Sequence, residues 1–159
     1  MEASLEALMY QRILVPVDTS STAQCGLREA IRLAADQKAR LLILHVVDDF
    51  TTLVEVPSAG VYDELIRKLR QSGLDALANA RHQAEEASVH TETLLREVTG
   101  KRVAEVIVDQ CKQHACDLVV MGTHGRRGLG RLTMGSDAEE VVRTSAVPVL
   151  LVRDVPTVT

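Results

Sequence analysis

Residues 12–21 read R-I-L-V-P-V-D-T-S-S, and this stretch decides the fold class. Its first six residues form a short, continuous and partly β-branched apolar run, which is typical of a strand buried on both faces of a parallel sheet. Four consecutive residues that favour a helix N-cap follow, and apolar residues then recur on one helical face as far as about Gln37. The stretch therefore predicts a central strand that leads directly into a covering helix.

The same alternation of strand and helix continues along the chain. Three further buried strands are predicted, at residues 40–47, 117–121 and 148–152. A more polar run at residues 89–98 suits an edge strand. Three further helices are predicted, at residues 62–87, 103–111 and 136–144, and Gly73 weakens the middle of the first. Five strands alternating with four helices predict an α/β fold with a mainly parallel, doubly wound sheet covered by helices on both faces.

Length and composition favour one cytoplasmic domain. With 159 residues and 46% hydrophobic content the chain can bury one core, and we expect a domain at residues 10–153 between tails at 1–9 and 154–159. A net charge of -4 disfavours binding to nucleic acid or to a membrane surface, and no apolar run approaches the roughly 20 residues of a membrane span. Cys25, Cys111 and Cys116 lack disulfide-like spacing, which favours a reducing compartment, and the last two are interpreted as buried small hydrophobic residues.

A glycine-rich stretch between a buried strand and a helix carries the candidate chemistry. It reads G-T-H-G at residues 122–125 and, after nine further residues, Gly135-Ser136. Phosphate oxygens need closely spaced backbone N–H donors, and the chain can approach that closely where Cβ atoms are absent. The start of the following helix adds N–H groups and the positive end of its dipole, and Ser136 adds a hydroxyl. The spacing therefore predicts a phosphate-binding loop.

Ordinary structural roles compete with this interpretation. The glycines also suit a surface turn, and Ser136 with Glu139 forms an S-x-x-E capping box that needs no ligand. Asp18 is as well suited to helix capping, with Thr19 and Ser20, as to a ligand. His124 is also compatible with a solvated loop imidazole.

The chain resembles the universal stress protein family, in its ATP-binding branch. The matching motifs are I-L-V-P-V-D at 13–18, L-H-V-V-D at 44–48, D-L-V-V-M-G-T-H-G at 117–125, G-x2-G-x9-G-S, and V-P-V-L-L-V at 147–152. The resemblance covers residues 10–153. It implies an open five-stranded sheet in the order 3-2-1-4-5, a Rossmann-like nucleotide-binding fold, frequent homodimerisation, and ATP lying across the ends of the first and fourth strands.

The resemblance also implies roles for individual residues. Those that would border the adenosine are Pro16, Val17, Asp18 and Thr19, and Val46 would offer backbone groups to adenine. Those that would hold the ribose and phosphates are Gly122, His124, Gly125, Arg126, Gly135 and Ser136, and Met121 is included among the nucleotide-binding residues. Asp18 would bond to the nucleotide directly or through a hydrated Mg²⁺, since that ion keeps several waters and uses few protein carboxylates.

Charged residues surround the predicted loop. Arg126, Arg127 and Arg131 suit phosphate oxygens because a guanidinium donates two parallel hydrogen bonds, although a solvated charged loop explains at least one of them. The acidic residues at the start of the last helix are expected to weaken triphosphate binding or to make it depend on Mg²⁺; they are Asp137, Glu139 and Glu140.

Three classes of function remain open. The loop lacks the Gly-Lys-Ser/Thr of a Walker A motif and no nucleophile stands beside a His and an acid at recognisable spacing, so an ATP-binding regulatory protein is favoured over an efficient enzyme. Slow ATP hydrolysis, with a water activated by Asp18 or His124, is one catalytic alternative. Catalysis of adenylyl transfer is another, and it rests on fold analogy alone. The rival is a nucleotide-independent module that dimerises through the apolar carboxyl-terminal strand, which contains Val149, Leu150, Leu151 and Val152.

Overall fold

A computed structural model describes residues 9–48, 58–124 and 134–154. Its elements are β1 (Arg12–Pro16), α1 (Ser21–Gln37), β2 (Arg40–Asp48), α2 (Ala59–Glu86), β3 (Thr91–Val98), α3 (Val103–Gln113), β4 (Leu118–Gly122), α4 (Ser136–Thr144) and β5 (Val149–Val152). Every strand and helix that the sequence predicts is present, and the ends differ by a few residues. Within the described residues the chain therefore alternates strand and helix as expected.

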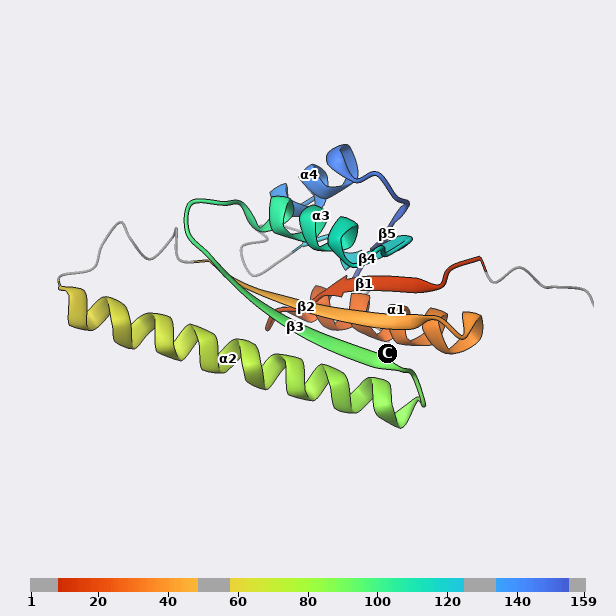
Figure 1. The fold of residues 1–159 in the computed structure, drawn as a ribbon, viewed down its shortest axis with the longest axis horizontal. Helices are drawn as coiled ribbons and strands as arrows, with labels where there is room; N and C mark the ends of the chain where they lie inside the picture. The colour runs from red at the N-terminus through yellow and green to blue at the C-terminus, as the bar shows by residue number, and fades with distance from the viewer. Residues whose placement is uncertain (1–8, 49–57, 125–133, 155–159) are drawn as a thin grey trace, which may run out of the picture.

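The described strands form one five-stranded sheet in the order β3-β2-β1-β4-β5, with every neighbouring pair parallel. This confirms the predicted order and the edge position of β3. The central strand is β1, which pairs with β2 on one side and with β4 on the other (Figure 1).

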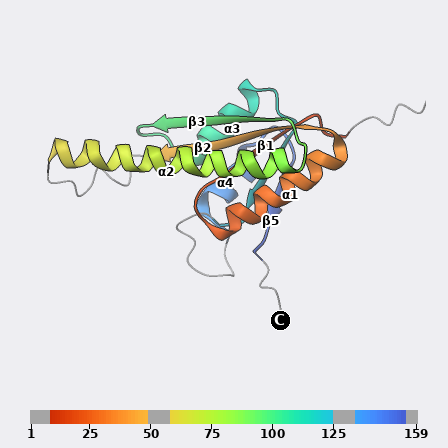
Figure 2. The same ribbon diagram turned by 90° about the horizontal axis from the view of Figure 1, so that it is seen from below.

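Two layers of helices cover the sheet, with α1 and α2 on one face and α3 and α4 on the other (Figures 1 and 2). Successive side chains of a strand point to opposite faces. Ile13 and Val15 therefore pack in the cluster under α1 and α2, whereas Leu14 packs in the cluster under α3 and α4. None of the three has any solvent exposure, which explains why the sequence of β1 is continuously apolar.

Two of the cysteines are packed as the sequence predicts. Cys111 and Cys116 are buried beside α3 and β4, and the Cys111 thiol lies 3.7 Å from the carbonyl oxygen of Cys116. Hydrogen bonding with Cys111, together with burial, raises the pKa of the Cys116 thiol well above its ordinary value. A protonated, buried thiol behaves as a small hydrophobic side chain.

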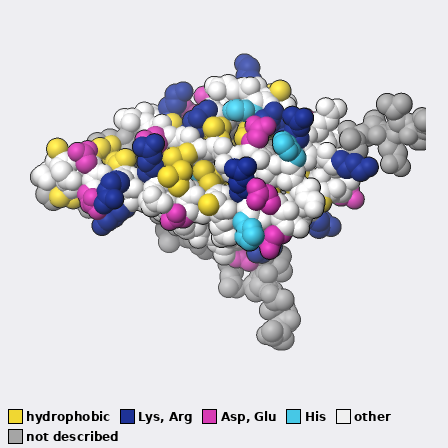
Figure 3. Space-filling view, turned by 60° about the horizontal axis from the view of Figure 1, so that its bottom comes forward, with side chains coloured by type: hydrophobic (Ala, Val, Ile, Leu, Met, Phe, Trp, Pro, Cys, Tyr) yellow, Lys and Arg dark blue, Asp and Glu magenta, His cyan; other side chains and the backbone are white. Residues whose placement is uncertain are grey.

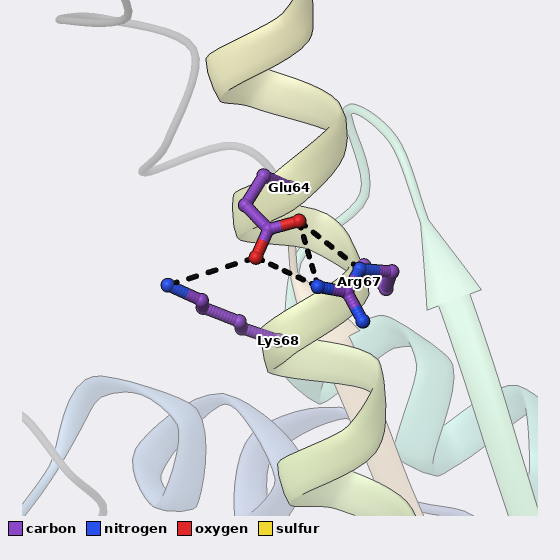
Figure 4. A network of polar contacts seen from close by, with 3 residues as sticks. All are labelled: Glu64, Arg67 and Lys68. Carbon is purple, nitrogen blue, oxygen red and sulfur yellow. Dashed lines mark hydrogen bonds and ion pairs between the residues drawn. The ribbon is translucent and has the colours of Figure 1, made fainter.

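The amino-terminal half of α2 extends beyond the sheet, and the first buried residue of the helix is Gly73 (Figures 1 and 2). Its outward face carries charged groups: Glu64 pairs with Arg67 at 2.7 Å and with Lys68 at 3.7 Å (Figure 4). The hydrogen bond from Arg67 lowers the pKa of Glu64, but such exposed pairs add little to stability. Viewed from the side on which α2 lies, the surface shows apolar side chains among charged ones (Figure 3).

No helix in the described part of the chain is long and apolar enough to cross a membrane.

Candidate functional site

The carboxyl ends of β1 and β4 lie side by side at the point where the sheet changes its winding direction. From β1 the chain crosses to β2 and then β3, whereas β4 and β5 lie on the other side of β1. The register pairs Leu14 with Val119, so the two strands end at the same edge of the sheet. In open α/β sheets this position forms the crevice that binds ligands.

Most of the residues selected from the sequence lie at this edge or on the elements that begin there. They are Pro16, Val17, Asp18 and Thr19 at the end of β1, Val46 in β2, Met121, Gly122 and His124 at the end of β4, and Gly135 and Ser136 at the start of α4. Gly125 and Arg126 lie outside the described residues, as do Arg127 and Arg131.

Both ladders of β1 stop at its carboxyl end. The carbonyl of Arg12 accepts a hydrogen bond from Asp117 N, so the even-numbered residues of β1 face β4. Pro16 is therefore the residue that should donate to β4 next, and it has no N–H group to donate. On the other side, the β1–β2 register ends at the pair of Pro16 and Leu44, while β2 continues to Asp48.

Val46 lies in the part of β2 that extends beyond β1. Arg40 N donates towards β1 and Leu41 N donates towards β3, so the even-numbered residues of β2 face β1. The last such bond runs from Val17 N to the carbonyl of Leu44, at 2.8 Å. The N–H and C=O of Val46 consequently point to the side of β2 on which β1 has ended. Val46 is half-buried, whereas Val47 is almost completely buried.

The turn after β1 is organised by Asp18 and Ser20. Asp18 Oδ1 accepts a hydrogen bond from Ser20 N at 2.7 Å, and Ser20 Oγ accepts one from Ala23 N at 3.1 Å. Ser20 is thus the N-cap of α1, and Thr19 is exposed and takes no part in the cap. One carboxylate oxygen of Asp18 therefore has a structural role that needs no ligand.

The glycine-rich loop begins and ends at the same place. Gly135 N donates to the carbonyl oxygen of Thr123 at 2.8 Å, which brings the chain back to the end of β4. Thr22 Oγ1 in the first turn of α1 donates to the carbonyl oxygen of His124. His124 is half-buried and its Nδ1 lies 2.9 Å from Thr123 Oγ1, so it is not a freely solvated imidazole. No sequence pattern indicated the role of Thr22.

The predicted capping box of Ser136 and Glu139 is wrong. A capping box requires the serine at the N-cap, but Gly135 occupies that position and Ser136 is already helical. Glycine has no side chain, and no side-chain cap bond is made at this helix start within the described residues. The first N–H groups of α4 are therefore not occupied by a cap at the point where the loop returns to β4.

One of the three acidic residues of α4 is neutralised within the fold. Glu140 pairs with Arg143 at 2.6 Å and with Arg102 at 3.8 Å. Asp137 and Glu139 lie in the first turn, where their charges oppose the approach of an anion.

Gly122 is required by packing inside the protein. A Cβ atom built on it would lie 2.5 Å from the carbonyl oxygen of Thr22, a separation that real Cβ atoms do not show. Gly26 makes the reciprocal approach, because its Cβ would lie 3.0 Å from Gly122 N. The first turns of α1 thus rest directly on the end of β4, and Gly122 is explained without a ligand.

A hollow of about 490 Å³ opens at the opposite, amino-terminal edge of the strands, lined by Ala34, Ala35, Lys38, Ala39, Arg40, Ala87, Ser88, Val89 and His90. It shares no residue with the predicted site. As for metals, no three His, Cys, Asp or Glu side chains across the described ranges are grouped so as to hold an ion.

A parallel sheet in this order, with a glycine-led helix start at the ends of its central strands, is the architecture of the Rossmann-like α/β folds. The model of the universal stress protein family matches residues 9–153, and the chain belongs to this family. The universal stress protein YxiE of Bacillus subtilis is 33% identical over 152 residues, which cover 91% of this chain and 100% of that one.

Solved structures share the fold. The universal stress protein UspA of Lactobacillus plantarum is similar with a TM-score of 0.78 and 29% identity, over 91% of this chain and 98% of that chain. The universal stress protein of Archaeoglobus fulgidus in complex with dAMP has a TM-score of 0.63 and 23% identity, over 90% and 98% of the two chains. At that identity the second likeness concerns the fold alone.

The close approach at Gly122 generates a stability prediction. Gly122→Ala should lower the free energy of unfolding by about 1–3 kcal/mol, because the added methyl group forces α1 away from β4. Gly60→Ala is the control: no atom lies within 4 Å of its Cβ position, and alanine in a helix should be neutral or stabilise by up to about 1 kcal/mol. Urea unfolding of both variants measures the difference, and an unchanged midpoint for Gly122→Ala would contradict the packing role.

Proposed function

We propose that this protein binds ATP across the ends of β1 and β4 and acts as a nucleotide-dependent regulatory protein in a stress response. The observation that carries the proposal is the hydrogen bond from Gly135 N to Thr123, which returns the uncapped start of α4 to the edge where β1 ends. Unpaired helix N–H groups and the positive end of the helix dipole favour phosphate there.

The phosphates are assigned to the loop and to the start of α4. Gly135 and Ser136 offer backbone N–H groups and a hydroxyl, and His124 is held beside them by Thr123. Family resemblance adds Gly125 and Arg126. Asp137 and Glu139 repel an unscreened triphosphate, which is why the proposal includes Mg²⁺ held through water by Asp18.

The adenine is assigned to the backbone of Val46. Its N–H and C=O point towards the side of β2 that β1 leaves uncovered, and one donor beside one acceptor matches N1 and the 6-amino group of adenine. Pro16, Val17 and Thr19 border the nucleoside from the end of β1, and Met121 and Gly122 border it from β4. The dAMP complex of the Archaeoglobus protein supports an adenine nucleotide on this fold.

Regulation is favoured over rapid turnover. Nucleotide occupancy is expected to order the contacts between the loop, α1 and α4, and so to alter the surface that a partner protein meets. The three free thiols favour the reducing environment of the cytoplasm for this role.

Homodimerisation through β5 is part of the proposal. Among the strands that the structure describes, β5 pairs with β4 alone, and it lies at the end of the sheet. Leu150 on this strand is 38% exposed and Val142 on α4 is 46% exposed. A second copy of the same strand would pair the free backbone edge and cover these apolar side chains.

Base discrimination tests the adenine assignment. ATP should bind at least about 10-fold more tightly than GTP, because guanine presents a donor and an acceptor where adenine presents the opposite, and each mismatched backbone group costs about 1–3 kcal/mol. Isothermal titration calorimetry of the purified protein with both nucleotides and Mg²⁺ measures the ratio. Equal affinities would contradict the Val46 assignment, and no binding of either would contradict the proposed function.

The role of Asp18 predicts a change in magnesium dependence. The side-chain amide in the Asp18→Asn variant keeps an oxygen for Ser20 N, so stability should change by less than about 0.5 kcal/mol. The variant should nevertheless bind ATP equally well in Mg²⁺ and in EDTA, as measured by calorimetry, whereas the wild type binds more tightly in Mg²⁺. Asp36→Asn, at the far end of α1, is the control and should keep the wild-type dependence.

The proposed dimer surface on β5 predicts that a charged substitution there halves the mass of the protein in solution. Leu150→Lys should convert the dimer to a monomer, because it places a charge on the covered edge. Val61→Lys, at a side chain 50% exposed near the amino end of α2, should remain dimeric. Sedimentation equilibrium distinguishes the two states, and a dimeric Leu150→Lys variant would exclude this interface.

A further inference from the structure

We infer that His45 is the positioning residue for base recognition, because its hydrogen bond to Val17 ends the β1–β2 ladder one step before Val46. The inference rests on the proposed nucleotide site, and it assigns to a buried side chain the task of keeping the backbone of Val46 available to the base. His45 itself does not contact the nucleotide in this assignment.

The hydrogen-bond ladder between β1 and β2 is interrupted after Leu44. In a parallel pair, the residue that donates to one carbonyl accepts from the amide two residues further along the partner strand. Val17 N donates to Leu44, so a continued ladder would have the carbonyl of Val17 accept from Val46 N. Instead the register ends before this pair, and His45 Nδ1 lies 2.8 Å from the Val17 carbonyl oxygen.

His45 is the donor of that hydrogen bond. A carbonyl oxygen only accepts, so Nδ1 of His45 carries the proton and donates. His45 as a whole residue is only 4% exposed, and a buried bond of this kind is strongly held because breaking it would leave a buried carbonyl without its donor. The side chain of residue 45 thus occupies the acceptor that the amide of residue 46 would otherwise use.

Helix α2 leaves space for the imidazole at Gly73. A Cβ atom on Gly73 would lie 2.5 Å from Cδ2 and 2.8 Å from Nε2 of His45. A glycine in the interior of a helix costs about 1 kcal/mol relative to alanine, so its presence in the 28-residue helix has a specific cause. Gly73 lets α2 pack directly on the ring and hold it against Val17.

These observations explain why β2 extends beyond the end of β1 on the side where adenine is proposed to bind. Pro16 ends the ladder with β4 because it has no N–H, and His45 ends the ladder with β2 because it takes the carbonyl of Val17. Without the imidazole, Val17 and Val46 could pair and the recognition edge would close. A histidine that merely fills the core would have no such effect on Val46.

Two substitutions at His45 separate the role of its hydrogen-bond donor from the role of its bulk. His45→Asn keeps a side-chain N–H close to the position of Nδ1, whereas His45→Leu keeps the approximate bulk without a donor. His45→Asn should retain the ATP-to-GTP affinity ratio within about threefold, and His45→Leu should reduce the wild-type ratio of about 10 or more to about 1–3. Both should bind inorganic tripolyphosphate as the wild type does, because the phosphate end of the site is unchanged.

A second readout needs no nucleotide. In the ligand-free protein, the backbone amide of Val46 should exchange with deuterium at least about 10-fold more slowly in His45→Leu than in the wild type, since it then donates to Val17. The amide of Leu44 serves as the internal reference. If the wild type binds no nucleotide, the proposed function fails, and the exchange measurement still decides whether His45 controls the ladder.

The outcomes that overturn the inference are specific. A folded His45→Leu variant that keeps both the wild-type base discrimination and the wild-type exchange of Val46 would reject it, as would loss of discrimination in His45→Asn. If His45→Leu does not fold, Gly73→Ala provides the test with the histidine still present, because its methyl group displaces the ring. Wild-type exchange of Val46 in Gly73→Ala would then reject the inference.

Discussion

The early end of β1 is the constraint on which the rest of this molecule depends. The strand has five residues and the neighbouring β2 has nine, so β2 continues for four residues beyond the last pair of the β1–β2 register. β1 is the central strand of the sheet, and it can end so abruptly only if its last polar groups are satisfied. His45 satisfies the carbonyl of Val17, and Ser20 caps α1, the helix that follows the strand.

Several residues that look like ligand contacts hold the edge of the sheet together. Gly122 allows α1 to rest on β4, Asp18 fixes the turn into α1, and Thr22 anchors the base of the loop at His124. These internal roles and the proposed nucleotide contacts are compatible, because they use different atoms of the same segments. A site built in this way is preorganised, since its backbone is positioned before a ligand arrives.

Membership of the universal stress protein family and the strand order agree with one another and with the continuous apolar pattern of the strands. Family membership establishes the fold but does not by itself establish the activity. One fold hosts many activities, and the site decides among them. The proposed site consists of the uncapped start of α4, the described ends of the loop at Thr123 and Gly135, and the edge of β2 beyond β1. All three arise from backbone groups, which explains why no catalytic triad or metal cluster is needed to motivate nucleotide binding.

The sequence alone determined the fold class and the elements, because apolar periodicity and glycine placement are local properties of the chain. Its motifs and the family resemblance propose Val46, Gly122 and Gly135 as nucleotide contacts, which stay predictions. The capping box, the alternative explanation for Ser136, is wrong because Ser136 is one residue past the N-cap. Only the tertiary structure decided why α2 contains a glycine at position 73 and why position 122 has no side chain. It alone connected His45 to Val17, residues separated by 28 positions. Such contacts depend on the distance between elements, and that distance is set by the packing of the whole core rather than by any local pattern.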